Sequence, residues 1–287
     1  MTLARIARTA TCVLSLLTTA LVSGCATPPP AGYAFAWGSN ASGEVGDGTN
    51  LPRAEPIPVS SLGRVLHMAA GGAHALAIKP DGTLWAWGDN SVGQLGTGRP
   101  ESSRRPVPVA SPPGARGIAT GVSHSLAVWD DGSVWAWGRG TEGQLGNGNA
   151  QNSNLPVRVN ITGATWIAAG RGHSLAVVSG RVWSWGSNSR SQLGTGAVGQ
   201  DSSPREVPGV SGIVAVAAGD THSLALGADG SVWAWGNGSG GQLGTGDSQD
   251  RAAPTRLTGL PPAAGIAARG DNSEGLARHG TVGTWGA

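Results

Sequence analysis

One motif is written five times along the chain, with a period of about 50 residues. The copies read FAWGSNASGEVGDG (35–48), WAWGDNSVGQLGTG (85–98), WAWGRGTEGQLGNG (135–148), WSWGSNSRSQLGTG (183–196) and WAWGNGSGGQLGTG (233–246), and a sixth copy begins at Thr284. Sequence repeats of roughly 20–50 residues are typical of solenoids and propellers, in which each unit buries its apolar face against the next. The period therefore constrains the fold more than any single motif does.

Residues 213–260 indicate how one period folds. IVAVAAG predicts a first strand, HSLALGADGSVWAWG predicts two strands joined by an Asp229-Gly230 turn, and PTRLTGL predicts a fourth. Asp81-Gly82 and Asp131-Gly132 repeat the turn, and Ser179-Gly180 replaces it in the fourth copy. The chain also contains 49 Gly among 287 residues, which disfavours helices. We expect an all-β fold, a β-propeller of four-stranded blades, with an open solenoid as the alternative.

The repeated residues WAWGxNxxGQLGTG and GxxHSLA resemble the repeats of the regulator of chromosome condensation family. That resemblance implies a propeller, commonly seven-bladed. Two departures lie near the ends: Gly43-Glu44-Val45-Gly46 replaces Gly-Gln-Leu-Gly in the first copy, and Ser273 stands where His is expected in the last. Because the sequence starts and stops at a third strand, we expect six recognisable blades. A truncated seven-bladed ring is the alternative.

The first 25 residues have the features of an export signal. Arg5 and Arg8 precede the uncharged stretch 9–22, which is too short to span a bilayer as a helix, and Ser23-Gly24-Cys25 follows. The segment resembles a bacterial lipoprotein signal, which implies that residues 1–24 are removed and that Cys25 carries the lipid. An ordinary secretory signal is the alternative. Residues 25–32 then form a Pro-rich spacer, and residues 33–287 form the propeller domain. We expect a lipid-anchored protein of the bacterial envelope, in the outer membrane if the envelope is Gram-negative, facing the periplasm or the exterior.

The charge of the chain argues against a nucleic-acid partner. Removal of Arg5 and Arg8 would bring the formal net charge of +2 to neutrality, and Lys79 is the only lysine. A surface that tracks phosphates needs a basic cluster, which this sequence lacks. We therefore expect an unidentified protein partner, with the membrane contacted through the lipid.

We assign structural roles to the residues that recur at the same position in each repeat. We expect the repeated Trp side chains to pack blades together and the repeated His side chains to make a hydrogen bond within each blade. One His per blade cannot converge on a metal ion, so we expect no metal, no cofactor and no catalytic residues. These structural positions are Trp37, Trp87, Trp137, Trp185, Trp235, Trp285, His74, His124, His173 and His222.

Function is then expected where the copies differ. The variable positions after each Trp-Gly and Gly-x-Gly carry mixed charges, which suits a protein-binding rim on a rigid scaffold. The candidate partner-binding residues are Asp89, Arg139, Glu142, Arg190, Arg104 and Arg105. We expect a non-catalytic interaction scaffold. One alternative is a carbohydrate- or cell-wall-binding module that uses Trp129 and Trp166. The family resemblance implies two others: exchange factors for a small nuclear GTPase, a role unsuited to an exported chain, and secreted inhibitors of β-lactamase.

Overall fold

The computed structural model describes residues 31–287, and every regular element in this range is a β-strand. The predicted signal segment, Cys25 and most of the spacer lie outside the described residues. Within the described range, no helix is long and apolar enough to cross a bilayer.

Five sheets follow one another along the chain as propeller blades. The first consists of β5 (His67–Ala70), β6 (His74–Ile78), β7 (Leu84–Gly88) and β8 (Ser103–Pro108). The second consists of β9 (Ala115–Thr120), β10 (His124–Trp129), β11 (Val134–Gly138) and β12 (Ser153–Arg158). The third consists of β13 (Ala164–Ala169), β14 (His173–Val178), β15 (Arg181–Gly186) and β16 (Asp201–Glu206). The fourth consists of β17 (Ile213–Ala218), β18 (His222–Gly227), β19 (Val232–Gly236) and β20 (Arg251–Arg256), and the fifth of β21 (Ala263–Arg269), β22 (Asn272–Ala277) and β23 (Val282–Gly286).

A two-stranded sheet precedes the five blades. It consists of β2 (Phe35–Gly38) and β3 (Arg53–Pro58), which match the third and fourth strands of a blade. The all-β propeller and its four-stranded blades are therefore confirmed, but the described chain has five clear blades rather than six. The first repeat copy contributes only this outer pair. A short pair that the repeat did not predict, β1 (Gly32–Tyr33) with β4 (Arg64–Val65), lies beside it.

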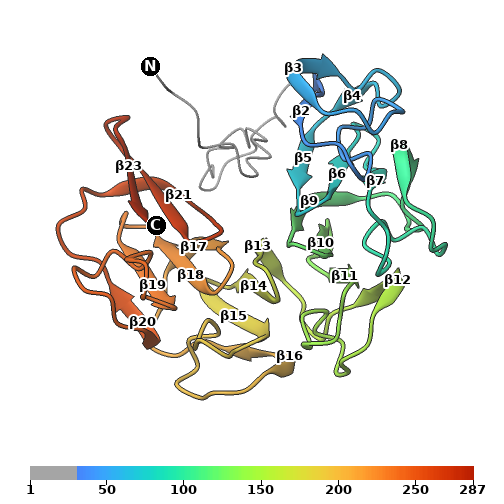
Figure 1. The fold of residues 1–287 in the computed structure, drawn as a ribbon. Coiled ribbons are helices and arrows are strands. Elements are labelled where there is room, and N and C mark those ends of the chain that lie inside the picture. The colour runs from blue at the N-terminus through green and yellow to red at the C-terminus, as the bar shows by residue number, and fades with distance from the viewer. Residues whose placement is uncertain (1–30) are drawn as a thin grey trace, which may run out of the picture.

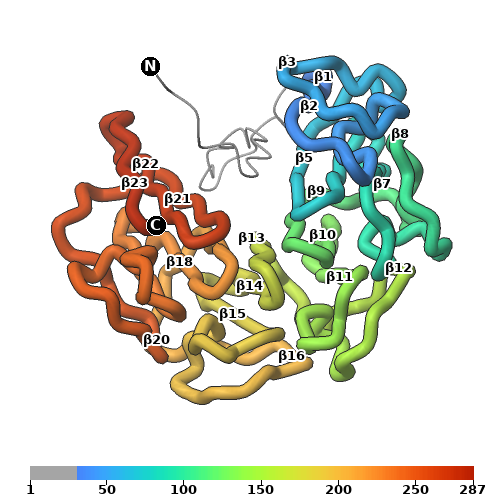
Figure 2. The backbone as a smooth tube through the Cα atoms, viewed as in Figure 1, coloured from blue at the N-terminus to red at the C-terminus, as the bar shows by residue number. Residues whose placement is uncertain are grey.

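The blades follow an arc around a centre (Figure 1). The first strand of each blade, such as β9, β13 or β17, lies nearest the centre, and the fourth, such as β12, β16 or β20, lies at the periphery. The arc is open between β21–β23 and the β2–β3 sheet (Figure 2). Near the centre, Arg269 Nη2 donates to the Gly71 carbonyl at 3.2 Å, so one side chain links the fifth blade to the first.

Each blade has two different faces, as alternation along a strand requires. In the fourth blade, Trp233 and Trp235 pack against the third blade, whereas Ala234 on the opposite face belongs to the cluster shared with the fifth. The expected bulky face and small face are therefore both present. Trp235 has no exposed surface, and burial of a ring this large contributes substantially to the stability of the interface.

A hydrogen-bond relay joins each blade to the next. His124 Nε2 lies 3.0 Å from Ser174 Oγ of the following blade, and Ser174 Oγ donates to the Gln144 carbonyl at 2.9 Å. The same carbonyl accepts a bond from Trp185 Nε1 at 2.9 Å. The prediction of a His bond within each blade is therefore wrong, because the bond crosses between blades. The other His-Ser pairs are His74-Ser125 (3.0 Å), His173-Ser223 (2.9 Å) and His222-Ser273 (2.8 Å).

The relay changes at both ends of the array. Ala75 occupies the serine position of the first blade, so the Glu44 carbonyl accepts only Trp87 Nε1. In the fifth blade, Asn272 pairs with Gly286 as His222 pairs with Gly236. The histidine position is therefore held by Asn272, and the earlier placement of Ser273 there is wrong by one residue. Ser273 instead accepts the bond from His222.

The turns between second and third strands form at the predicted positions. Asp81 accepts from the Thr83 N–H in the first blade, and Asp229 accepts from the Ser231 N–H in the fourth. Ser179 and Gly180 have φ values of 50° and 73°, which suit the two-residue hairpin turn that leaves Val178 opposite Arg181. This shorter turn explains part of the reduced spacing in that copy.

Candidate functional site

The long connections between third and fourth strands all lie at one end of the blades. We call them the loop rim: residues 39–52, 89–102, 139–152, 187–200 and 237–250. In each repeat, the variable stretches that follow Trp-Gly and Gly-x-Gly both lie within the connection between the third and fourth strands or directly after it. Arg104 and Arg105 lie on β8 itself, so they belong to the strand that leaves the rim rather than to a loop.

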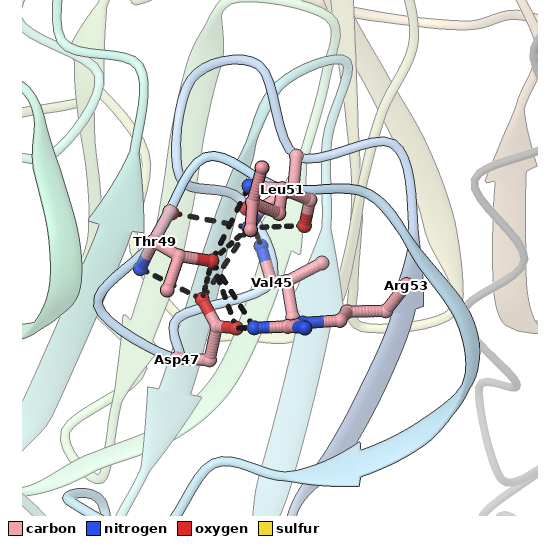
Figure 3. Close-up of polar contacts among 6 residues, drawn as sticks. Val45, Asp47, Thr49, Leu51 and Arg53 are labelled. Atoms are coloured by element: carbon pink, nitrogen blue, oxygen red, sulfur yellow. Dashed lines mark hydrogen bonds and ion pairs between the residues drawn. The ribbon is translucent and has the colours of Figure 1, made fainter.

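Buried asparagine side chains fix the shape of three of these connections. In the first, Asn40 Oδ1 accepts from the Val45 N–H, while Asn40 Nδ2 donates to the Thr49 and Leu51 carbonyls (Figure 3). Asp47 completes the cluster by pairing with Arg53 and accepting from the Thr49 N–H and hydroxyl. The equivalent asparagines of the second and fourth repeat copies are Asn90 and Asn188.

Asp47 is held as a carboxylate. Burial opposes its ionisation, but the Thr49 N–H, the Arg53 guanidinium and the Thr49 hydroxyl outweigh that cost and lower its pKa to about 2. Asp47 Oδ1 accepts from Asn40 and Thr49, and Oδ2 accepts from Arg53 Nε at 2.8 Å. Both carboxylate oxygens are therefore already engaged within the first loop.

Two connections use glycine instead of asparagine. Gly140 and Gly238 donate their N–H groups to Asn152 Oδ1 and Asp250 Oδ1, both at 3.0 Å. The Gln151 and Gln249 carbonyls stand where a side chain at these glycines would begin. The loop backbone fills the space that Asn40 fills in the first copy, so the rim keeps a fixed shape with a different sequence.

Four of the predicted partner-binding residues are engaged within the rim. Asp89 accepts from the Ser91 N–H and from Gln94 Nε2. Arg139 pairs with Glu142 at 3.2 Å in the same loop, and Arg190 pairs with Asp250 of the next loop at 3.2 Å. The structure places all four on one rim, but their charges are largely satisfied there.

Arg104 and Arg105 differ from those four residues. Both are exposed, and neither makes an ion pair with a described acidic residue. The Arg104 carbonyl accepts from the Gly48 N–H at 2.8 Å, which ties β8 to the first loop. The six predicted partner-binding residues therefore divide into charges that are used for loop structure and charges that remain available.

The loop rim also carries exposed apolar side chains that the sequence reasoning missed. Leu51 is 63% exposed and Val198 is 83% exposed, both in these connections, and Val122 in the turn after β9 is 39% exposed. Leu155 projects from the adjoining end of β12, whereas Leu260, which is 40% exposed, lies at the opposite rim, as do Phe35 and Val282 at the starts of β2 and β23. In the sequence, these residues could have been recognised as apolar side chains within otherwise polar loops. Tyr33, Phe35 and Val282 lie in the sheets that border the opening of the arc.

The tryptophans considered for carbohydrate binding do not form a platform. Trp129 is only 7% exposed, packs against Trp135 at 5.8 Å between ring centroids, and donates to the Pro112 carbonyl. Trp166 is half-buried, and its Nε1 donates to the Val216 carbonyl of the next blade at 3.0 Å. Both rings stabilise the propeller instead of presenting a flat exposed face.

The histidines remain spread around the array. No group of three or more potential metal ligands comes together in the part of the chain that the structure describes. Each relay histidine is buried and neutral: loss of hydration lowers the pKa of His74 and His222 to about 4 and of His124 and His173 to about 3.

Comparison with known proteins agrees with the family that the sequence repeat indicates. The model of the RCC1-like domain matches residues 31–287. Human WBSCR16 is 26% identical, with 88% of this chain and 73% of that chain covered and a TM-score of 0.76. Prp20p of Saccharomyces cerevisiae, described with its binding to Gsp1p and histones, is 22% identical over 90% of this chain and 81% of that one, with a TM-score of 0.64.

A second yeast structure, Prp20 bound to Kap60, is 20% identical, covers 99% of this chain and 86% of that chain, and has a TM-score of 0.62. No curated protein sequence matches the chain significantly. The domain model spans the whole described range, including the repeats that build the blades. The chain therefore belongs to the RCC1-like domain family.

Proposed function

We propose that this propeller is a non-catalytic scaffold that binds a protein partner through its loop rim. The observation that carries the proposal is the coincidence of exposed Leu51 and Val198 with unpaired Arg104 and Arg105 at one end of a rigid array. The buried core of a protein interface is more apolar than the rest of the surface, and arginine is enriched there. The Prp20 structures, described with Gsp1p and Kap60, offer a precedent for protein binding by this fold.

The opposite rim differs from the loop rim in the length of its turns. Its turns are short and shaped by Asp side chains that bond to their own backbone, as at Asp81 and Asp229. Leu260 is exposed there, and Phe35 and Val282, which begin β2 and β23, are exposed at the same end of the blades.

We propose further that the protein works at the bacterial envelope, attached by a lipid on Cys25. Support comes from the sequence Val22-Ser23-Gly24-Cys25, which follows a basic and then an apolar segment. The test is expression of Cys25→Ser beside the wild type, with membrane fractionation and mass measurement of the N-terminal peptide. We expect a lipid adduct and membrane retention for the wild type only. Equal membrane retention of both forms, without an adduct, would argue against the anchor.

Capture from detergent-solubilised envelope tests the scaffold. The bait is the full chain, and the rim variant is the double substitution Leu51→Glu and Val198→Glu. Leu260→Glu serves as the matched control on the opposite rim. We expect a protein that is retained by the wild type and the control but lost from the rim variant. Capture that is insensitive to the rim variant and lost with the control would contradict the proposal. If the captured protein were an enzyme such as a β-lactamase, activity assays would distinguish inhibition from simple tethering.

A further inference from the structure

The edge of β2 that faces the centre of the array is open among the described residues. In each of the first four blades the third strand pairs on both sides, as β7 pairs with β6 and with β8. β2 holds the third-strand position of the first repeat copy but pairs with β3 alone. The described chain therefore has no strand at the place where the second strands of the other blades lie (Figure 1).

This edge carries unpaired backbone groups. In all five blades, the residue that follows the third strand donates its N–H to the turn before the second strand, as Asp89 does to the Ala73 carbonyl at 2.8 Å. Ser39 holds this position after β2 and makes no such bond with a described residue. Because backbone groups alternate between the two edges of a strand, Phe35 and Trp37 present theirs to the same edge as Ser39. Such an edge is a template for pairing with another strand.

An apolar groove runs along the open edge. Its lining includes Ala36 of β2, Met68 and Ala70 of β5, and Ala75 of β6. Met68 is half-buried, whereas Val216, which holds the same position in the fourth blade, is only 3% exposed. The described residues therefore leave part of the first blade's packing surface uncovered.

The four junctions between successive blades show what covers this surface elsewhere. At each of them, the second strand of the preceding blade contributes two aliphatic residues, two positions apart, to the apolar cluster. The cluster beneath β2 contains no such pair among the described residues. An occupant of the groove is therefore expected to be extended, with aliphatic side chains at alternate positions. The four pairs, none of whose members is more than 4% exposed, are Leu76-Ile78, Leu126-Val128, Leu175-Val177 and Leu224-Leu226.

The occupant is expected to differ from the repeat at one point. In the other blades, a relay serine meets the histidine that begins the second strand of the preceding blade. Ala75 holds the serine position in the first blade, so a histidine at the start of an added strand would find no hydroxyl there. Because an unpartnered polar group is costly in such a site, a small apolar residue suits this position better.

The chain itself is poorly suited to supply this strand. Pro28, Pro29 and Pro30, in the sequence that precedes β1, have no N–H to donate to a ladder. A second copy offers β23, which pairs with β22 alone, but its two residues on one face are Val282 and Thr284 and not an aliphatic pair. These features favour a segment of a different protein.

We propose that the inner edge of β2 binds an extended apolar segment of another protein. The segment adds as an antiparallel strand and places two aliphatic side chains on Met68 and Ala70. Addition of a strand to an open sheet edge is a recurring mode of peptide recognition, in which main-chain hydrogen bonds give affinity and side-chain pockets give specificity. The site is separate from Leu51 and Val198, so the inference goes beyond the proposed function and does not depend on it.

The test uses the full chain in detergent and a fluorescein-labelled peptide, with binding measured by anisotropy. The peptide has the sequence of residues 121–130, which includes β10, and carries His124→Ala. A control peptide also carries Leu126→Asp and Val128→Asp. We expect the first peptide to bind at least tenfold more tightly than the control, because only the first buries the aliphatic pair. Equal binding of the two peptides would overturn the inference.

Two measurements on the protein locate the peptide. Met68→Glu should weaken its binding at least tenfold, whereas Leu260→Glu at the opposite rim should change it less than twofold. In hydrogen exchange, the peptide should slow exchange at the N–H groups of Phe35, Trp37 and Ser39. Equal losses in the two variants, or protection confined to other segments, would overturn the inference. The exchange measurement uses the wild type, so it decides the matter even if Met68→Glu fails to fold.

The same exchange measurement identifies other occupants. Protection of Phe35, Trp37 and Ser39 before peptide is added, at every protein concentration, would assign the edge to the chain's own N-terminal residues. Protection that grows with concentration, together with a dimer in light scattering, would assign it to a second copy. Either result would overturn a partner protein. Absence of a rim-dependent partner in the envelope capture would refute the scaffold proposal and leave these measurements unaffected.

Discussion

At the residue scale, the molecule depends on a buried polar relay that every internal blade junction repeats. Ser174 Oγ gives its proton to the Gln144 carbonyl, so it can accept only from an N–H on His124 Nε2. His124 Nδ1 then carries a lone pair that has no hydrogen-bond partner. A second proton on this ring would be buried without an acceptor, so the relay requires neutral histidine.

The relay predicts a steep loss of stability in mild acid. The pKa values of the four histidines fall from an ordinary 6.5 to between about 3 and about 4, so the unfolded chain binds more protons than the folded one between these limits. The free energy of unfolding therefore falls as the pH drops from about 6.5 to about 4, by up to about 1.4 kcal/mol per pH unit for each histidine. Denaturant titration at pH 7.5, 6 and 5 measures it.

The control for this pH effect is His279→Ala, which removes an exposed histidine outside the relay and is expected to leave the profile unchanged. Asp47, with a pKa near 2, loses its stabilising charge only at lower pH, so it does not contribute to the same window. A stability that is flat between pH 7.5 and 5 would show that the histidines are not buried and neutral.

Removal of one relay hydroxyl should lower the free energy of unfolding. Ser174→Ala leaves the His124 N–H without an acceptor in a buried site, and we expect a loss of about 1–3 kcal/mol in the free energy of unfolding. Ser248→Ala, in an exposed loop, is expected to change it by less than about 0.5 kcal/mol. Equal effects of the two substitutions, measured by urea denaturation, would rule out a structural role for the relay.

At the element scale, the blade is a unit whose two faces are encoded by alternation. The strand Trp233-Ala234-Trp235 was sufficient to predict which side is bulky, and the Asp-Gly turns were sufficient to predict the hairpins. The sequence could not predict that the His bond crosses to the next blade, because strand spacing fixes the positions within a sheet but not the stacking of two sheets. The one-residue error at Ser273 has a different cause, within the sheet: spacing along the sequence did not fix the register of β22 against β23, which strand pairing resolves.

Blade stacking also explains glycines that have ordinary φ values. A Cβ atom at Gly71 would lie 2.5 Å from the Gly121 carbonyl and 2.5 Å from His74 Cε1. We expect Gly71→Ala to lower the midpoint of thermal unfolding by several degrees or to reduce the soluble yield, because the turn cannot move away from both groups. Gly283→Ala, in a strand with nothing within 4 Å of the new atom, is the matched control and should be nearly neutral.

If Gly71→Ala were as stable as Gly283→Ala in calorimetry, the close approach of the inner turns would be wrong. A variant that fails to fold supports the same conclusion as a lowered midpoint, provided that the control is expressed normally.

At the scale of the whole molecule, the repeat makes a rigid array and leaves function to the positions that the repeat does not dictate. The period and the Trp and His positions were enough to predict a propeller of the family that the domain model matches. The candidate site was harder to predict from the sequence than the fold. Formal charge marked Arg139 and Arg190 as strongly as Arg104 and Arg105, and only the ion pairs distinguish them. Leu51 and Val198 gained significance once both were placed at the same end of the blades.

The most direct test of the central claim, that the loop rim is the binding face, is site-specific photocrosslinking in cells. A photoreactive amino acid is placed at Leu51 or Val198 on the rim, and at Leu260 on the opposite rim as the control. We expect a discrete adduct of higher mass from Leu51 and Val198 that is absent at Leu260. An adduct from Leu260 alone, or equal adducts from all three positions, would contradict it.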